Sequence, residues 1–164
     1  MGWWSRYRRW WAGDARTMYA GGRPGPRAKR LNAFWARAAR LGLGGDRLVT
    51  LEVIGRTSGR PISVPLMPAR VDGVLYLGSM LGEGANWVRN VRAAGGHAVL
   101  HHAGRHERVV LAEVPVDQRA PLIRAFLDAA PGARPHVPVD RNAPLHQIAA
   151  VADQIPIFRV ERRS

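Results

Sequence analysis

The chain has 164 residues, of which 46% are hydrophobic and 23% charged, a composition typical of a single globular domain with a sizeable core. It contains no cysteine, which excludes disulfides, thiolate metal sites and thiol nucleophiles. Twenty-five basic residues against twelve acidic ones give a net charge of +13, and no stretch is apolar over the roughly 18 residues that a membrane-spanning helix needs.

Most of the positive charge lies at the N-terminal end, since residues 1–47 contain eleven basic and two acidic residues. This concentration predicts an anionic partner. At helical spacing, residues 1–22 place tryptophans on one face and arginines on the opposite face, which is typical of a helix lying in a membrane interface. The alternative is that the tryptophans pack on the body or on a second subunit. The separation of rings from arginines disfavours a nucleic-acid partner.

A basic Gly/Pro-rich linker follows, and the next segment has the periodicity of a helix that packs on the core. Its apolar positions are Leu31, Phe34, Trp35, Ala38 and Leu41. We therefore divide the chain into an amphipathic helix (1–22), a basic linker and helix (23–46) and a body (47–164).

The body begins with short β-branched runs separated by turns. The expected strands are residues 47–55, 60–71, 74–79, 97–104, 105–115 and 155–161. In the second of these, Pro61, Pro65 and Pro68 indicate an edge strand or an irregular path. Asp72-Gly73 is a hairpin signal.

Helices are expected between these strands, over residues 82–96, 116–130 and 145–152, with Asp117 capping the second. A Pro-rich loop spans residues 131–144. Because the strands are mostly joined by hairpins, a doubly wound parallel sheet is disfavoured. The pattern predicts an α+β, mainly β fold: a small antiparallel barrel with peripheral helices.

Two glycine-containing turns could hold an anion. The turn Gly55–Arg60 combines backbone N–H groups, two hydroxyls and two guanidiniums, which suit a phosphate or a carboxylate, although a plain hairpin turn is the alternative. The segment Gly78–Gly84 runs into a helix that contains Asn86 and Asn90, and a helix start presents free N–H groups.

The histidines give weaker signals. His97, His101, His102 and His106 lie on one expected hairpin, but alternation separates them and no HExxH motif is present, so we expect no metal site. His136 lies alone in the Pro-rich loop, as a candidate proton donor. No GxSxG motif or paired carboxylates indicate nucleophilic or acid–base catalysis.

Residues 47–91 nevertheless resemble a known family. A strand is followed by G-R-T-S-G-R-P, then V-P-L, a D-G hairpin, a strand ending at Ser79, and N-W-V-R-N. This order resembles the deazaflavin-dependent nitroreductase family, and the likeness extends to the closing I-P-I-F-R-V strand.

The resemblance implies a split β-barrel that binds coenzyme F420, an 8-hydroxy-5-deazaflavin with a phosphate and a polyglutamate tail. It implies hydride transfer from the reduced cofactor to a small-molecule acceptor: a quinone, a nitro compound or another activated double bond. The implied cofactor-binding residues are Arg56, Thr57, Ser58, Arg60, Ile62, Ser63, Val64, Pro65, Leu66, Leu77, Gly78, Ser79, Met80, Asn86, Trp87, Val88, Arg89 and Asn90. His136 is the nearest candidate donor to the acceptor.

The sequence departs from the family pattern at Thr57 and Met80, where relatives often carry lysine, and the loop before the last strand has no tyrosine. Two alternatives therefore stay open: a non-catalytic deazaflavin carrier at the membrane, and an FMN-binding split-barrel enzyme. We expect a cytoplasmic protein, either free or peripheral on the inner face of the membrane. A homodimer is a further expected partner, because proteins of this fold often dimerise.

Overall fold

The computed structural model describes residues 25–26, 29–30, 33–34, 37–38, 41 and 45–162. The predicted amphipathic helix over residues 1–22 lies outside the described residues. In the next segment the described residues between 26 and 38 are helical. The expected core-packing face is only partly right: Ala38 is buried, whereas Phe34 and Leu41 are 61% and 69% exposed.

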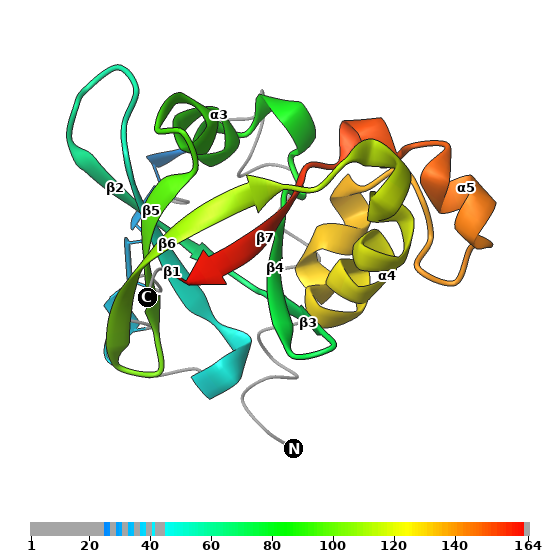
Figure 1. Cartoon of the computed structure of the whole chain (residues 1–164), viewed down its shortest axis with the longest axis horizontal. Helices are drawn as coiled ribbons and strands as arrows, with labels where there is room; N and C mark the ends of the chain where they lie inside the picture. Colours follow the sequence, from blue (N-terminus) through cyan, green and yellow to red (C-terminus); the bar gives the residue numbers. More distant parts are fainter. Residues whose placement is uncertain are drawn as a thin grey trace.

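In the described part of the chain, seven strands form one antiparallel sheet, with the order β2-β1-β5-β6-β7-β4-β3 (Figure 1). The strands are β1 (Val49–Ile54), β2 (Pro61–Leu66), β3 (Ala69–Val71), β4 (Val74–Gly78), β5 (His97–His102), β6 (Arg105–Glu113) and β7 (Ile157–Arg162). Within residues 45–162 the helices are α3 (Asn86–Ala93), α4 (Arg119–Ala129) and α5 (Leu145–Ala149), with short 3-10 turns before, between and after them. The antiparallel pairing confirms the predicted hairpin-rich, mainly β class.

The sheet curls because its two edge strands are adjacent in the chain. β2 lies at one edge of the sheet and β3 at the other, yet only Met67 and Pro68 separate them. Three residue steps span at most about 11 Å, so the two edges must approach each other at this point. The resulting curled sheet is the predicted split barrel.

The prediction of one strand from residue 60 to residue 71 was wrong, because Met67 and Pro68 divide this run into two strands. Pro65 and Pro68 have no N–H to donate to a ladder, and the run breaks into β2 and β3. The prediction of an edge position is confirmed for both pieces.

Two apolar clusters hold the fold together. The first fills the curl with inward-facing side chains of β1 and β4–β7, and α3 adds Trp87, Val88 and Val91. The Trp87 and Phe158 rings pack there with centroids 5.5 Å apart. The second cluster joins α4, α5 and the Pro-rich loop to β3 and the start of β7. Figure 1 accordingly shows α3 at one end of the curl, and α4 and α5 grouped beside β3 and β4.

The start of α4 differs from the prediction. Asp117 does not cap this helix, because it lies within a 3-10 turn, η4 (Val116–Gln118), and the N-cap is Gln118 without a side-chain hydrogen bond. The chain turns once more, through the Gln118 N–H bond to the Pro115 carbonyl (3.0 Å), before the α-helix begins.

Candidate cofactor site

The turn after β1 is fixed to the first turns of α3 by Arg56. Its backbone N–H donates to Asn90 Oδ1 (3.2 Å) and its Nη1 donates to the same oxygen (2.8 Å). Its Nη2 makes a longer bond to Asn86 Oδ1 (3.4 Å). Asn90 is 2% exposed, so this oxygen is an interior acceptor that a charged donor satisfies. The structure thus brings together two motifs that lie more than 25 residues apart in the chain.

The turn itself is tightly folded. The Gly55 N–H donates to the Arg60 carbonyl (2.9 Å) and the Gly59 N–H donates to the Gly55 carbonyl (2.8 Å). Gly59 has φ +65, and a Cβ on Gly55 would lie 2.6 Å from Ser58 Oγ. The positive φ favours glycine at position 59, whereas a side chain at position 55 would require the Ser58 and Ile62 side chains to move. Thr57, Ser58 and Arg60 are left exposed on the turn.

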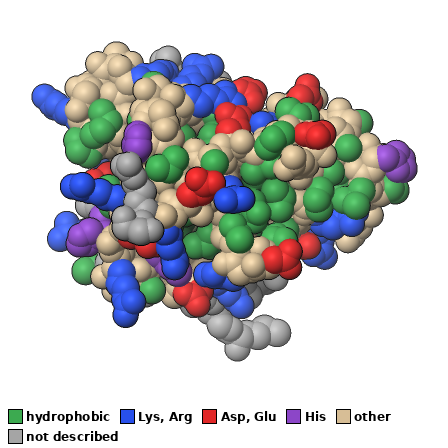
Figure 2. Space-filling view, in the orientation of Figure 1, with side chains coloured by type: hydrophobic (Ala, Val, Ile, Leu, Met, Phe, Trp, Pro, Cys, Tyr) green, Lys and Arg blue, Asp and Glu red, His purple; other side chains and the backbone are tan. Residues whose placement is uncertain are grey.

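The electrostatic character of this end is positive. The turn of residues 55–60 contains two arginines and no acidic residue. Among the described residues, neither the Arg60 nor the Arg89 side chain has an ion pair, and both residues are exposed. Figure 2 shows blue side chains over the α3 end of the molecule, with carboxylates beside them. The Glu83 carboxylate, which lies just before α3 in the chain, pairs with Arg92 of that helix.

The predicted residues of β2 line the edge of the sheet next to this turn. Val64 and Leu66 pack partly against the first cluster, to which α3 also belongs, and Ile62 is 39% exposed. Ser63 and Pro65 alternate with these three on the other face. As an edge strand, β2 has a row of backbone groups on the side that faces no described strand, although Pro61 and Pro65 contribute no N–H to it. Such a row can hydrogen-bond the heteroatoms of a flat ring.

Several predicted site residues are structural. Leu77, Trp87 and Val88 have their side chains in the core. Ser79 is 1% exposed, and its Oγ donates to the Gly82 carbonyl (2.9 Å). Gly78 faces the Phe126 ring. Any contact that these five make with a cofactor would therefore be indirect or through the backbone.

Met80 and the candidate proton donor His136 lie at or beside the second apolar cluster. Met80 packs against the second cluster. His136 ends a 3-10 helix, η5 (Pro131–His136), beside Val137 of the same cluster. His136 and the Arg56–Asn90 pair thus lie on different elements, and the role of His136 stays a prediction.

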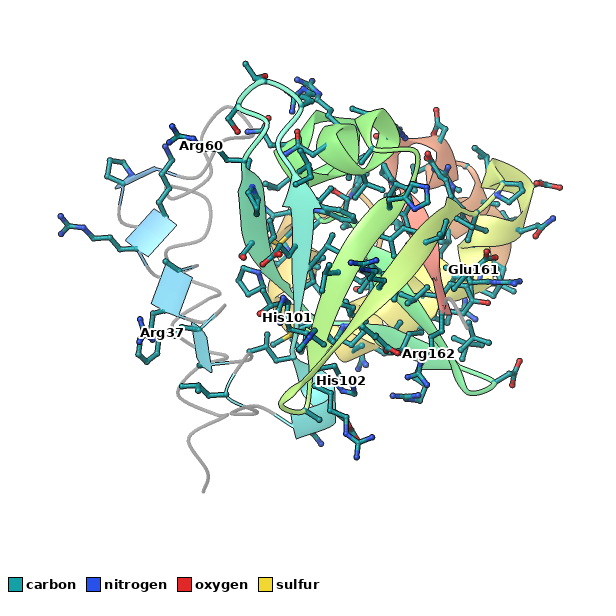
Figure 3. All side chains as sticks on the ribbon, turned by 60° about the vertical axis from the view of Figure 1, so that its left-hand side comes forward. Arg37, Arg60, His101, His102, Glu161 and Arg162 are labelled. Atoms are coloured by element: carbon teal, nitrogen blue, oxygen red, sulfur yellow. The ribbon has the colours of Figure 1, made fainter. Side chains whose placement is uncertain are left out.

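The histidines of β5 do not join the site either. His101 is paired in register with Thr50 at the start of β1, whereas the turn follows Ile54 at its end. Figure 3 shows Arg60 near one end of the sheet, with His101 and His102 well below it. They approach carboxylates instead: His101 Nε2 lies 3.5 Å from Glu52, and His102 Nε2 lies 3.2 Å from Asp46.

Sequence reasoning missed one part of this end, an ionic cluster around Arg92 that includes Glu83 and Glu113. The three residues come from α3, from the glycine-rich loop and from the end of β6. Neither helical nor strand periodicity relates them, so only the folded topology reveals the cluster.

Comparison with known proteins identifies the family of the chain. A family model described as F420H2-dependent quinone reductase matches residues 28–147. The chain belongs to this family. Membership in the F420H2-dependent quinone reductases confirms the resemblance seen in the sequence, the assignment as an F420-dependent oxidoreductase, and coenzyme F420 as the cofactor.

Solved structures share the fold of this quinone reductase family member. An F420H2-dependent reductase, FDR-A, is 21% identical, with a TM-score of 0.50, over 70% of this chain and 94% of that one. A domain-swapped dimer is 16% identical, with a TM-score of 0.53, over 81% and 95%. A protein of unknown function from Agrobacterium tumefaciens is 15% identical, with a TM-score of 0.52, over 88% and 60%. A comparison with curated proteins gave no match.

The residues at this end fit F420 chemically. Its phosphate and carboxylates need cationic donors, and the exposed Arg60 and Arg89 supply guanidiniums without competing partners in the described part of the chain. Its planar ring needs an apolar face with hydrogen-bonding groups at the rim. The partly exposed side chains and free backbone of β2 provide both.

Proposed function

We propose that this protein holds F420 between the 55–60 turn, the edge strand β2 and the first turns of α3, and that the acceptor is a quinone. The observation that carries the proposal is the double hydrogen bond of Arg56 to the buried Asn90. It supports a shared site because it fixes the positively charged turn against the helix that carries Arg89.

The residues of the site then have distinct tasks. Arg60 and Arg89, with the hydroxyls of Thr57 and Ser58, bind the phosphate and carboxylates of the cofactor. Arg56, Asn86 and Asn90 set the position of the turn. The backbone of β2 orients the ring. Leu77, Gly78, Ser79, Met80, Trp87 and Val88 support these groups from the core side.

The redox chemistry itself comes from the cofactor, which supplies a hydride when it is bound in its reduced form. The protein's contribution is to hold donor and acceptor at a fixed separation and to exclude water. The family description supports a quinone among the acceptor classes expected from the sequence. We retain His136 as the candidate that donates a proton to the reduced acceptor.

We further propose that residues 1–22 bind an anionic membrane surface on the cytoplasmic side, with residues 23–46 linking them to the cofactor-binding body of residues 47–164. The basic, tryptophan-rich composition of the first segment supports this arrangement, and long-chain quinones partition into membranes. Within the described residues no helix has the length and apolar character needed to span a bilayer. A homodimer is the remaining proposal, which sedimentation of the full chain tests.

The first experiment is a fluorescence titration of the full chain with F420, with FMN in parallel. We expect micromolar or tighter binding of F420 and much weaker binding of FMN. Oxidation of reduced F420 is then followed with a soluble quinone and with a nitroaromatic compound. Binding without turnover of either acceptor would favour a carrier, and tight binding of FMN alone would contradict the proposal.

Substitution of Arg60 tests the assigned site. Removing one charge-assisted contact costs about 1.5–3 kcal/mol, or roughly tenfold or more in affinity, so Arg60→Ala should raise the Kd for F420 without changing the urea midpoint. Arg70→Ala is the matched control, since Arg70 is an exposed arginine on β3. Equal F420 affinity in the two variants would remove Arg60 from the site.

A further inference from the structure

The glycine-rich loop that precedes α3 is fixed at its base. The Ser79 N–H donates to the Pro156 carbonyl (3.0 Å), and the Gly82 N–H donates to the Ser79 carbonyl (3.3 Å). Gly82 has φ +64, and a Cβ there would lie 2.8 Å from the Gln154 carbonyl oxygen. Toward its tip the loop is open, since a Cβ on Gly84 would meet nothing within 4 Å. The step from Glu83 to α3 is held by the Ala85 N–H, which donates to the Gly82 carbonyl (3.3 Å), and by Ala85, which is 1% exposed.

Arg92 adds side-chain contacts that hold the glycine-rich loop in place. Its guanidinium contacts both carboxylate oxygens of Glu83, at 2.5 and 3.0 Å, and both oxygens of Glu113, at 2.8 and 2.6 Å. Two bidentate contacts define the orientation of the planar guanidinium. Glu83 belongs to the loop, Arg92 to the last turn of α3 and Glu113 to the end of β6, so one side chain joins three elements.

The cluster is anchored in the interior by Arg119. This residue is 5% exposed, and its Nη2 donates to Glu113 (3.0 Å). Its Nε donates to the Val114 carbonyl (2.8 Å), and its Nη1 donates to the carbonyls of Ala152 and Ile155. The buried Arg119 thereby fixes Glu113. Glu113 in turn accepts from Arg92, which also binds the more exposed Glu83.

We propose that Glu83 and Arg92 are positioning residues for the cofactor site, a role that rests on the proposed function. They fix the glycine-rich loop to α3, and α3 carries Asn86, Asn90 and Arg89. Without the pair, the loop and the first turns of α3 sample other positions. Affinity then falls by the fraction of the time that the site is not correctly formed. Neither residue touches the cofactor in this proposal.

The variant Glu83→Gln tests this role, because it removes the charge and keeps the shape. Glu161→Gln is a closely matched control: Glu161 pairs with Arg159 at 3.0 Å, and the exposed fractions of the two glutamates are 42% and 49%. Glu161 lies on β7, outside the loop (Figure 3). Each variant is titrated with F420, assayed with a soluble quinone, and measured by amide hydrogen exchange over residues 79–90 without cofactor.

For Glu83→Gln we expect the Kd for F420 and the KM for reduced F420 to rise about three- to fivefold, as expected for one partly exposed ion pair in a network. The kcat at saturating cofactor should not change, and the difference from wild type should shrink at high salt. Amides of residues 79–90 should exchange faster. Glu161→Gln should match wild type in every readout.

Three results would contradict the positioning role. Wild-type affinity in Glu83→Gln, with wild-type exchange over residues 79–90, overturns the positioning role and leaves the proposed function intact. Failure of the wild-type chain to bind F420 overturns the proposed function, and the positioning role with it. A fall in kcat with an unchanged KM would also contradict the role, because a positioning pair acts on binding.

Discussion

Asn90 shows how one buried amide can fix the position of an exposed turn. Its side-chain oxygen accepts both the backbone N–H and the guanidinium of Arg56, which lies 34 positions earlier. The exposed turn therefore takes its position from an interior residue. Arg56 is expected to contribute to F420 binding through this anchorage as well as through its charge.

Replacing Asn90 with alanine should therefore affect both stability and binding. Loss of the acceptor leaves a charge-assisted bond unmade, so we expect the free energy of unfolding to fall by about 1–2 kcal/mol and the Kd for F420 to rise. Urea unfolding and fluorescence titration measure the two effects. Asn142→Ala, at an exposed loop position, is the control. An unchanged Kd in Asn90→Ala would show that the turn does not need its anchor.

The Glu83–Arg92 contact also predicts a pH dependence. The hydrogen bond from Arg92 lowers the pKa of Glu83 below its ordinary value of 4.5, and hydrogen bonds to Glu113 and Glu83 raise the pKa of Arg92. The folded state favours the ionised carboxylate, so the pair contributes fully to stability when the pH is above the ordinary pKa of Glu83. This contribution is lost as the pH falls through the lowered pKa of Glu83 in the folded protein.

The urea midpoints of wild type and Glu83→Gln should accordingly differ by a constant amount from pH 7 down to about pH 5 and converge below that. Because Glu83 is half-exposed, the difference between the two urea midpoints is small. The way this difference changes with pH is therefore more informative than its size. A difference that grows on acidification would mean that the carboxylate is destabilising in the folded protein.

At the scale of elements, β4 and α4 meet through a glycine. A Cβ on Gly78 would lie 2.6–2.8 Å from atoms of the Phe126 ring, and Phe126 is 4% exposed. We expect Gly78→Ala to destabilise the fold by about 1–3 kcal/mol through overpacking, as measured by urea unfolding. Gly84→Ala, in open space, should change stability much less.

A second substitution checks the cause. Phe126→Leu removes the flat ring that a new methyl group would contact, so the double variant should lose less stability than the sum of the two single variants. Additive losses would indicate that Gly78 matters for its backbone conformation and not for its contact with α4.

The strands were the most predictable elements, because alternation and turn residues mark them locally. Six runs became seven strands when Met67-Pro68 divided one of them. The division could not be foreseen, since it depends on where β2 and β3 find partners at opposite edges of the sheet. The prediction that Asp117 caps α4 was wrong for a similar reason. Aspartate is a residue type that favours a helix start, but an extra 3-10 turn precedes α4.

The candidate site was predictable as a set of segments and not as a set of contacts. The turn residues Arg56–Arg60 and the helix residues Asn86–Asn90 were both singled out from their residue types. Their connection through one amide oxygen required the fold. Phe34 and Leu41 are exposed, although the sequence predicted that they pack on the core. Helical periodicity predicts an apolar face, but it does not predict which surface that face contacts.

For the molecule as a whole, the main open prediction concerns residues 1–22. We expect the full chain to bind vesicles that contain an anionic lipid, with binding that weakens as salt is added and disappears on neutral vesicles. Deletion of residues 1–22 should abolish vesicle binding and leave the Kd for F420 unchanged. Loss of both together would assign this segment to the cofactor site.

The position of β7 bears on how the chain is made. β7 follows every other strand in sequence, yet it lies between β6 and β4 in the sheet. Until β7 has been synthesised, β2-β1-β5-β6 and β4-β3 have no strand to join them, and the apolar interior of the curl stays open. A ribosome that stalls before Ile157 would thus present two exposed strand edges, β6 and β4, to chaperones and to other nascent chains.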